Sequence, residues 1–378
     1  MMRNFSLARF WAVLVKEFVQ MRRDRLTFAM MIGVPIMQLI LFGFAINSDP
    51  KALPTAVLAA DNSIYARTLV RAIENTGYFH VVREVTSESE VERALARGSV
   101  QFAVTIPENF ARKLERGERP VLLVEADASD PAATSNALAA LLALNQTALT
   151  RDLQGVLGDL QSQAPPFELR VQRRYNPEGI TQYNVVPGLI GVVLTMTMVM
   201  MTSLAVTREY ERGTMENLLA TPLRPIEVMV GKIVPYIIVG YVQVSVILIA
   251  AKLLFEVPIL GSLALLSLLL ILFIAANLAI GYTFSTLAKS QMQAMQMTFF
   301  FFLPSMLLSG FMFPFRGMLQ WAQWLGEVFP LTHFLRIVRG ILLKGNGMAE
   351  IYPSVWPIAL FMVLAGAVAL YRYRETLD

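Results

Sequence analysis

The sequence of 378 residues contains no cysteine and only two histidines, His80 and His333. The lack of cysteine excludes disulfide bonds, thiolate metal sites and cysteine nucleophiles. Two histidines so far apart also exclude an H-E-x-x-H zinc site. Charged residues make up only 16% of the chain, whereas a soluble domain carries about 25%. This shortage of charge excludes an ordinary soluble enzyme, a disordered chain and a nucleic-acid-binding protein.

Hydrophobic residues make up 55% of the chain, and they gather in six runs that are almost free of charge. Each run has about the 20 residues that a helix needs to cross a bilayer. They predict spans over residues 26–48, 183–206, 231–252, 260–287, 291–314 and 351–372. The expected fold is therefore an α-helical polytopic membrane protein with six transmembrane helices.

Lysine and arginine near the span ends indicate the orientation. Basic residues cluster in segments 1–25 and 207–230, and others are Lys289 between the fourth and fifth spans and Arg372 and Arg374 at the end of the sixth. Six spans place all four groups, with the tail 373–378, on one side of the membrane, taken as the cytoplasm. Both termini are then cytoplasmic. Lys252 is a mild exception, and segment 315–350 is a larger one, with Arg316, Arg336, Arg339 and Lys344 on the other side.

Two segments flanking the spans are interpreted as interfacial. Segment 315–350 is apolar and aromatic, and we expect short helices that dip into the outer leaflet, divided at Pro330 and Gly340. In segment 1–25, residues 7–21 have one apolar and one basic face, which favours a helix in the inner interface. A signal peptide is the alternative for that segment, but it needs a continuous apolar core and a small-residue cleavage site.

Residues 49–180 differ in composition, with 14 basic and 17 acidic residues. They follow the first predicted span and so form an extracytoplasmic insert. Strands are expected over 54–60, 79–84, 100–106, 121–125 and 169–174, and helices over 63–77, 87–98, 108–117 and from 130 to about 160. Ser87 and Glu90 have the spacing of a capping box. This alternation predicts an α/β (α+β) domain with a mostly parallel or mixed sheet.

Sites for chemistry are scarce. Glu125, Asp127 and Asp130 could hold a metal, but helix capping and loop solvation are favoured because no D-x-D-x-D-G calcium loop is present. There is no P-loop and no G-x-S-x-G motif, and the longest cytoplasmic loop, about 25 residues, is too short for a nucleotide-binding domain. We therefore expect no enzyme, and any ATPase must be another chain.

The charged segment after the second span is the most informative one. Gly213 ends the helix, Thr214 can cap a short new helix, and Pro222 stops it. Such a short helix, held on a transmembrane helix, could transmit a push from a cytoplasmic partner to the bundle. The alternative is a plain connecting loop with solvating charges. The residues assigned to coupling are Glu209, Glu211, Arg212, Gly213, Thr214, Glu216, Asn217, Leu218, Thr221 and Pro222.

This segment resembles the coupling loop of type-2 ABC exporter permeases, whose motif E-R-G-T-x-E-x-L-x-x-T-P matches Glu211 to Pro222. Val186-Pro187-Gly188, Phe313-Pro314 and Arg339-Gly340 agree with it. In the insert, residues 106–110 and 127–130 resemble the extracytoplasmic domain of the subfamily linked to multidrug efflux, with Ala128 in place of an expected glycine.

The resemblance implies a half-transporter of the bacterial inner membrane. Two permease subunits, identical or paralogous, would pair with two ABC ATPase chains, which bind ATP and magnesium, while this chain binds no cofactor. Closure of the ATPases would drive alternating access for hydrophobic or amphipathic compounds. A periplasmic adaptor is a further implied partner, membrane lipid surrounds the spans, and no nucleic acid is involved.

Polar, methionine and aromatic side chains within the spans are candidates for a substrate pathway, because burying polar groups in lipid is unfavourable and soft walls suit variable apolar substrates. They are Gln38, Thr195, Met198, Gln293, Gln296, Phe299, Phe302 and Met306. Interhelical hydrogen bonding, core packing and lipid contact are the alternative roles.

Two other functions are alternatives to the exporter. An ion channel or secondary carrier is disfavoured because no Asp, Glu, Lys or Arg lies near the middle of a predicted span and no inverted repeat is evident. A scaffold whose insert binds a partner would not need the short helix of residues 214–220. A P-loop ATPase encoded next to this chain would favour the exporter.

Overall fold

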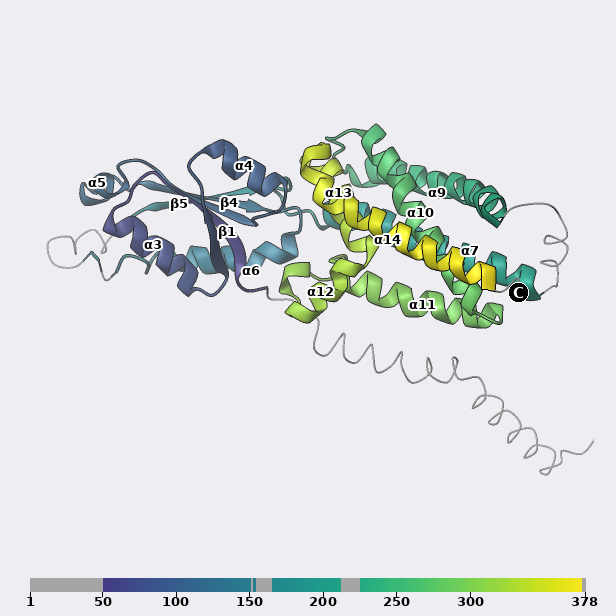
Figure 1. The fold of residues 1–378 in the computed structure, drawn as a ribbon. Helices are drawn as coiled ribbons and strands as arrows, with labels where there is room; N and C mark the ends of the chain where they lie inside the picture. The colour runs from purple at the N-terminus through teal and green to yellow at the C-terminus, as the bar shows by residue number, and fades with distance from the viewer. Residues whose placement is uncertain (1–49, 151, 154–164, 212–224, 376–378) are drawn as a thin grey trace, which may run out of the picture.

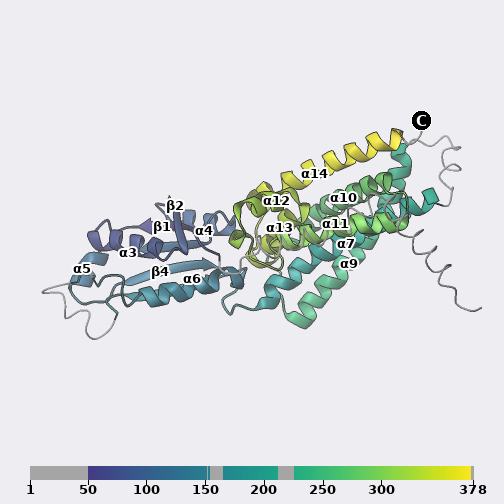
Figure 2. The same ribbon diagram turned by 90° about the horizontal axis from the view of Figure 1, so that it is seen from below.

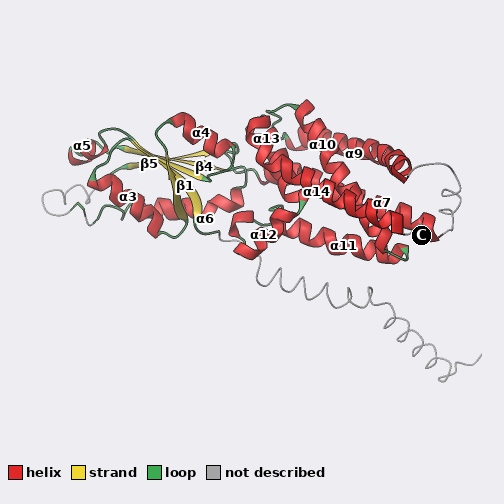
Figure 3. Ribbon diagram, viewed as in Figure 1, coloured by secondary structure: helices red, strands yellow, loops and turns green. Residues whose placement is uncertain are grey.

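The computed structural model describes residues 50–150, 152–153, 165–211 and 225–375. These residues form an elongated molecule, with a sheet domain at one end and a bundle of long helices at the other (Figures 1 and 2). Every described strand lies in the sheet domain, as Figure 3 shows by colour. The predicted interfacial helix 7–21 and the first span, 26–48, lie outside the described residues.

Five strands form one mixed sheet with the order β2-β1-β3-β4-β5. Their bounds are β1 Leu53–Ala59, β2 Phe79–Glu84, β3 Phe102–Ile106, β4 Val121–Asp127 and β5 Glu168–Arg174. β1 pairs in parallel with β2 and β3, and β4 pairs in parallel with β5. The β3–β4 pair is antiparallel, so the sheet is mixed rather than fully parallel.

Helices cover both faces of this sheet. They are α3 Ile64–Asn75, α4 Glu88–Ala96, α5 Phe110–Glu115 and α6 Pro131–Leu144. Side chains alternate along a strand, so Leu53 and Val57 of β1 share a core with α3, α5 and α6, whereas Ala56 packs with Val91 and Leu95 of α4 on the other face. Because successive side chains of a strand face opposite sides of the sheet, the sequence pattern was sufficient to predict the strands.

The loop after β1 is held by the carboxylate of Asp61, which accepts hydrogen bonds from the backbone nitrogens of Ser63 at 2.8 Å and Ala111 at 2.9 Å. Asn109, just before α5, has a left-handed backbone (φ 57°), which asparagine tolerates better than most residues. The motif at residues 106–110 is therefore a turn that docks α5 against the end of β1.

Two local predictions in the domain were wrong. The helix that begins after Asp130 ends at Leu144, not near residue 160, and turns follow over residues 145–150. Asn145, Thr147 and Thr150 are poor helix formers. The capping box does not form: Ser87 makes no capping hydrogen bond, and Glu90 accepts from the Thr86 nitrogen at 3.1 Å instead of from the Ser87 nitrogen.

The bundle contains eight described helical segments. They are α7 Thr181–Glu211, α9 Pro225–Phe255, α10 Leu263–Leu287, α11 Gln291–Leu308, η3 Phe315–Gly317, α12 Gln320–Val328, α13 Pro330–Lys344 and α14 Met348–Glu375. Among them α7, α9, α10 and α14 are long and apolar enough to cross a membrane. The fold is thus mostly helical with four candidate spans and one small sheet domain.

The predicted fifth span, 291–314, is shorter in the structure. Its helix, α11, ends at Leu308, and Gly310 turns the chain with φ +83°. Gln291, Gln293 and Gln296 in its first turns lower its hydropathy, and α11 is not among the four candidate spans of the described residues. Six transmembrane helices therefore remain a prediction.

Segment 315–350 contains short helices, and Pro330 begins α13 as a proline at a first helical position should. The predicted break at Gly340 was wrong, because α13 continues through it to Lys344. Gly345, with φ +70°, ends the helix instead. Gly340 is needed for space: a Cβ there would lie 3.1 Å from Asn346 Nδ2, where the chain folds back.

The long helix α7 is central to the bundle, where it contacts α9, α10, α11 and α13, and α10 packs in turn on α14. The rings of Phe273 in α10 and Phe334 in α13 stack with centroids 3.9 Å apart. Both rings are fully buried. The non-spanning helix α13 is therefore part of the same core as the candidate spans.

Candidate coupling site and domain junction

Glu211, the last residue of α7, connects the predicted coupling segment to α11. Its carboxylate accepts hydrogen bonds from the backbone nitrogen of Gln291 at 2.8 Å and from Gln291 Nε2 at 2.5 Å. These bonds favour the ionised carboxylate and hold the pKa of Glu211 below its ordinary value. A displacement of the segment after α7 would thus reach the first turn of α11 directly.

Most of the other predicted coupling residues, from Arg212 to Pro222, lie outside the described residues. Glu209 lies in the last turns of α7. The short helix expected over 214–220 and the role of this segment therefore remain predictions.

In addition to the contact made by Glu211, earlier residues of α7 approach both α11 and α10 closely. Ser203 Oγ lies 3.1 Å from Thr298 Oγ1 of α11, and both side chains are buried. Towards α10, a Cβ built on Gly281 would lie 2.9 Å from the Thr202 Cβ and 2.9 Å from the Val199 carbonyl oxygen. Small and hydroxyl side chains allow such helix contacts in membranes, so the three helices form one closely packed unit.

The candidate pathway residues do not form a single group. Met198 and Phe302 are buried in the main bundle core, and Met306 packs against it. Thr195 is 1% exposed, and its hydroxyl has no hydrogen-bond partner among the described residues. Phe299 is 39% exposed and faces away from this core. Four of these side chains, those of Thr195, Met198, Phe302 and Met306, are therefore packed inside or against the bundle core.

The two candidate glutamines lie at the start of α11. The side-chain oxygen of Gln293 accepts a hydrogen bond from the Lys289 nitrogen at 2.8 Å, and Gln296 is half-buried one turn further on. Gln38 lies outside the described residues. A pathway through these residues remains a prediction.

The sheet domain docks on the bundle through the carboxyl end of α4. The carbonyl oxygens of Leu95, Ala96 and Gly98 accept hydrogen bonds from Lys344 Nζ at 3.1 Å, Asn346 Nδ2 at 2.8 Å and Arg316 Nη2 at 2.8 Å, respectively. The last carbonyls of a helix have no partner within it and carry partial negative charge. Cationic and amide donors from the bundle supply those partners.

The acidic residues near the end of β4 pair mainly with cationic and amide side chains. Asp127 Oδ2 lies 2.5 Å from Lys344 Nζ, and both side chains are under 10% exposed. Glu125 accepts from Arg174 Nε at 2.7 Å. Asp130 accepts from Asn184 Nδ2 at 3.3 Å, and burial raises the pKa of its carboxyl. These interactions describe a docking surface.

Sequence reasoning missed Gln291, Asn346 and the docking role of Lys344. The sequence signal for this junction was the group of basic residues in 315–350, which is an exception to the enrichment of Lys and Arg in cytoplasmic loops. In the structure Arg336 pairs with Glu327 at 2.6 Å and Lys344 pairs with Asp127. Part of the unexpected positive charge therefore belongs to contacts within the protein.

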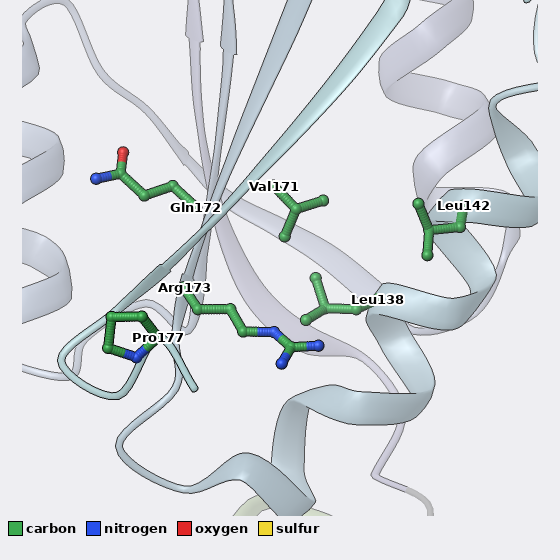
Figure 4. A pocket seen from close by; sticks show the side chains of 6 residues that line it. All are labelled: Leu138, Leu142, Val171, Gln172, Arg173 and Pro177. Carbon is green, nitrogen blue, oxygen red and sulfur yellow. The ribbon is translucent and has the colours of Figure 1, made fainter. Parts of the chain in front are cut away.

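A separate hollow of about 570 Å³ lies on the sheet domain, between α6 and the edge strand β5. Val171 and Arg173 point toward Leu138, while Gln172 points to the other side of the strand (Figure 4). Leu142 at its side is 59% exposed. Arg173 is the charged side chain among the residues that line it.

The four described apolar helices long enough to cross a membrane, together with the docked sheet domain, define a polytopic membrane protein. The family model described as "ABC-2 family transporter protein" matches residues 25–371. The chain therefore belongs to the ABC-2 family of transporter proteins. ABC-2 permeases are the membrane components of ABC transporters and work with an ABC ATPase subunit.

Three bacterial proteins are similar over nearly their whole length. The Escherichia coli (strain K12) protein "Probable multidrug ABC transporter permease YbhR" is 29% identical over 97% of this chain and 98% of its own. YbhS, with the same description, is 27% identical over 96% and 94%. "Inner membrane transport permease YhhJ" is 28% identical over 90% and 93%. The resemblance predicted from the sequence is confirmed.

Proposed function

We propose that this chain is the permease subunit of an ATP-driven exporter that moves hydrophobic or amphipathic compounds out of the cytoplasm or inner leaflet. The near full-length similarity to permeases named for multidrug transport carries the proposal. Two copies, or this chain and a paralogue, pair with two ATPase subunits that bind ATP and magnesium. The permease itself binds neither.

The helix contacts support a mechanism for coupling. Closure of the ATPases pushes on segment 207–230. The Glu211–Gln291 hydrogen bonds pass the displacement to α11. Because α7 packs closely on α11 at Ser203 and on α10 at Gly281, the three helices move together. Their movement against the second subunit switches the transporter between inward and outward states.

The same proposal assigns the two ends of the bundle to opposite sides of the membrane. The end of α7 at Glu211 and both chain termini face the cytoplasm. The sheet domain, at the opposite end of the bundle in Figure 1, lies outside it. There it is available to an adaptor protein that receives the exported compound.

Affinity purification of the tagged chain from membranes in mild detergent tests the proposal. We expect a stoichiometric P-loop ATPase to co-purify and to hydrolyse ATP. Replacing residues 214–220 should remove it, whereas replacing Arg112 and Lys113 on α5 should not. A chain that purifies alone in several detergents, with no nucleotide dependence, would contradict the proposal.

A further inference from the structure

A polar pocket of about 500 Å³ lies where the sheet domain meets the bundle. It is bounded by the end of α4, the end of β4, η3, α12, α13 and the first turns of α14, around the space between α4 and α13 in Figure 1. In Figure 1 the pocket is at the opposite end of the bundle from the carboxyl end of α7, whose last residue is Glu211. Whatever binds there is therefore separate from the coupling site.

Cationic side chains dominate the accessible part of this pocket. The lining contains the basic residues Arg97, Arg316, Arg336, Arg339 and Lys344, and the acidic residues Asp127, Asp130, Glu327 and Glu350. Two of the four carboxylates are already engaged, Asp127 by Lys344 and Glu327 by Arg336. Arg316 and Arg339 form no ion pair with a carboxylate in the described part of the chain.

Arg339 is the most unusual of these residues. Its Nη1 donates to the Gly310 carbonyl oxygen at 3.1 Å. Its Nε and Nη2 are enclosed and have no hydrogen-bond partner among the described residues. Asp130 interacts electrostatically with the same guanidinium, while its carboxylate accepts a hydrogen bond from Asn184 Nδ2. Leaving donors of a charged group unpaired is costly, so the site is incomplete without an acceptor.

Arg316 supplies a second cationic group on the open side of the pocket. Its side chain is exposed, and its Nη2 donates to the Gly98 carbonyl oxygen at 2.8 Å. The pocket therefore combines one enclosed arginine with one that an incoming ligand can reach. The reachable guanidinium of Arg316 can make multidentate hydrogen bonds to a phosphate or carboxylate group, and the nearby charge of Arg339 favours an anion there.

Apolar side chains also line the pocket. They include Phe315, Ile351, Trp356 and Pro357. Trp356 is 53% exposed near the start of α14, which continues as a candidate membrane span. Tryptophan is enriched where a span meets the headgroup region. A ligand that contacts both the cationic and the apolar side chains of the pocket has an acidic head and an apolar body.

We propose that this pocket binds the phosphate- or carboxylate-type headgroup of an anionic amphipath. Arg339 and Arg316 contact the acidic group, and the wall formed by Ile351 and Trp356 contacts the apolar chain. The ligand is a lipid of the surrounding membrane or another amphipath of the same chemistry. The inference does not depend on transport, because it rests on residues outside the coupling segment.

Titration calorimetry on the full-length chain in dodecyl maltoside tests the inference. The probes are short-chain phosphatidylglycerol, phosphatidylcholine with the same acyl chains, and inorganic phosphate. We expect phosphatidylglycerol to bind at least about tenfold more tightly than phosphatidylcholine, and Arg316→Gln and Arg339→Gln each to weaken it about tenfold. Arg170→Gln, which removes an exposed arginine of β5, should leave binding unchanged.

Three results would overturn the proposal. One is equal binding of the two lipids. Another is unchanged affinity in Arg316→Gln. Because Arg316 also donates to the Gly98 carbonyl across the domain junction, thermal unfolding of this variant checks that the domain stays docked. The third is displacement of phosphatidylglycerol by inorganic phosphate at a similar concentration, which would identify a free-anion site. The result for ATPase co-purification is independent of all three.

Discussion

At the residue scale, Glu211 makes the contact that links coupling to the bundle. Glu211→Gln keeps the shape of the side chain but removes its charge, and so weakens the hydrogen bonds to Gln291. We expect ATP-dependent transport to fall at least about fivefold, with membrane insertion unchanged. Glu178→Gln, at an exposed glutamate before α7, is the control. Equal transport by the unmodified protein, Glu211→Gln and Glu178→Gln would contradict a coupling role for Glu211.

The same contact should depend on pH in a defined direction. The folded-state pKa of Glu211 lies below its ordinary value of 4.5 because Gln291 donates to the ionised carboxylate. The contact is therefore fully present above pH 4.5 and is lost as the pH falls through the lower folded-state value. Hydrogen exchange of the α11 amides, corrected for its intrinsic pH dependence, should show this loss. Glu211→Gln should remove that pH dependence.

Asp61 plays a local structural role that can be tested separately. Burial acts to raise its pKa, but the hydrogen bonds from Ala111 and Ser63 outweigh burial and lower it. Asp61→Ala leaves those amides unpaired, which costs about 1–3 kcal/mol. We expect amide exchange in α5 to become about tenfold faster. Glu108→Ala, at an exposed neighbour, should not accelerate it.

At the element scale, the close approach of α7 and α10 gives a prediction with a matched control. Gly281→Ala places a Cβ 2.9 Å from the backbone carbonyl of Val199, where little can move. We expect a loss of about 1–3 kcal/mol, from overpacking. In Gly366→Ala the new Cβ meets nothing within 4 Å. Thermal unfolding in detergent should show a lower Tm for Gly281→Ala only.

The sequence was sufficient for most elements because their signals are local. Alternating burial marks the strands, and Gly77, Gly98 and Gly117 follow the ends of three helices with φ of +75°, +67° and +72°. Local signals failed at Gly340, where the glycine serves a close approach to Asn346 rather than a break. Local signals also failed at the end of α6, where Leu144 is followed by turns and no glycine or proline marks the end.

The contacts that build the candidate sites could not be predicted in the same way. Gln291 and Glu211 are 80 residues apart, and Lys344 and Asp127 are 217 residues apart. Composition and spacing cannot pair residues at such separations. The misplaced positive charge of segment 315–350 was the signal available for the junction. It indicates that an exception to the loop-charge rule can mark a docking surface.

At the scale of the whole molecule, the Asp127–Lys344 pair joins the sheet domain to the bundle. Lys344→Met leaves Asp127 buried without its cation, which costs about 3–5 kcal/mol. The double variant Asp127→Asn with Lys344→Met should recover much of that loss. In contrast, removing the exposed Arg170–Glu168 pair should leave the free energy of unfolding nearly unchanged, because solvent screens an exposed ion pair. Additive losses in a double-mutant cycle of unfolding would contradict a direct pair.

The central claim is that ATP hydrolysis by a partner drives export through this chain. The most direct measurement is transport of a fluorescent amphipathic dye into inside-out proteoliposomes containing the chain and its ATPase. We expect dye accumulation that requires ATP hydrolysis, stops with a non-hydrolysable analogue and falls in Glu211→Gln. Dye movement that is equal without ATP, or that follows an imposed proton gradient instead, would contradict it.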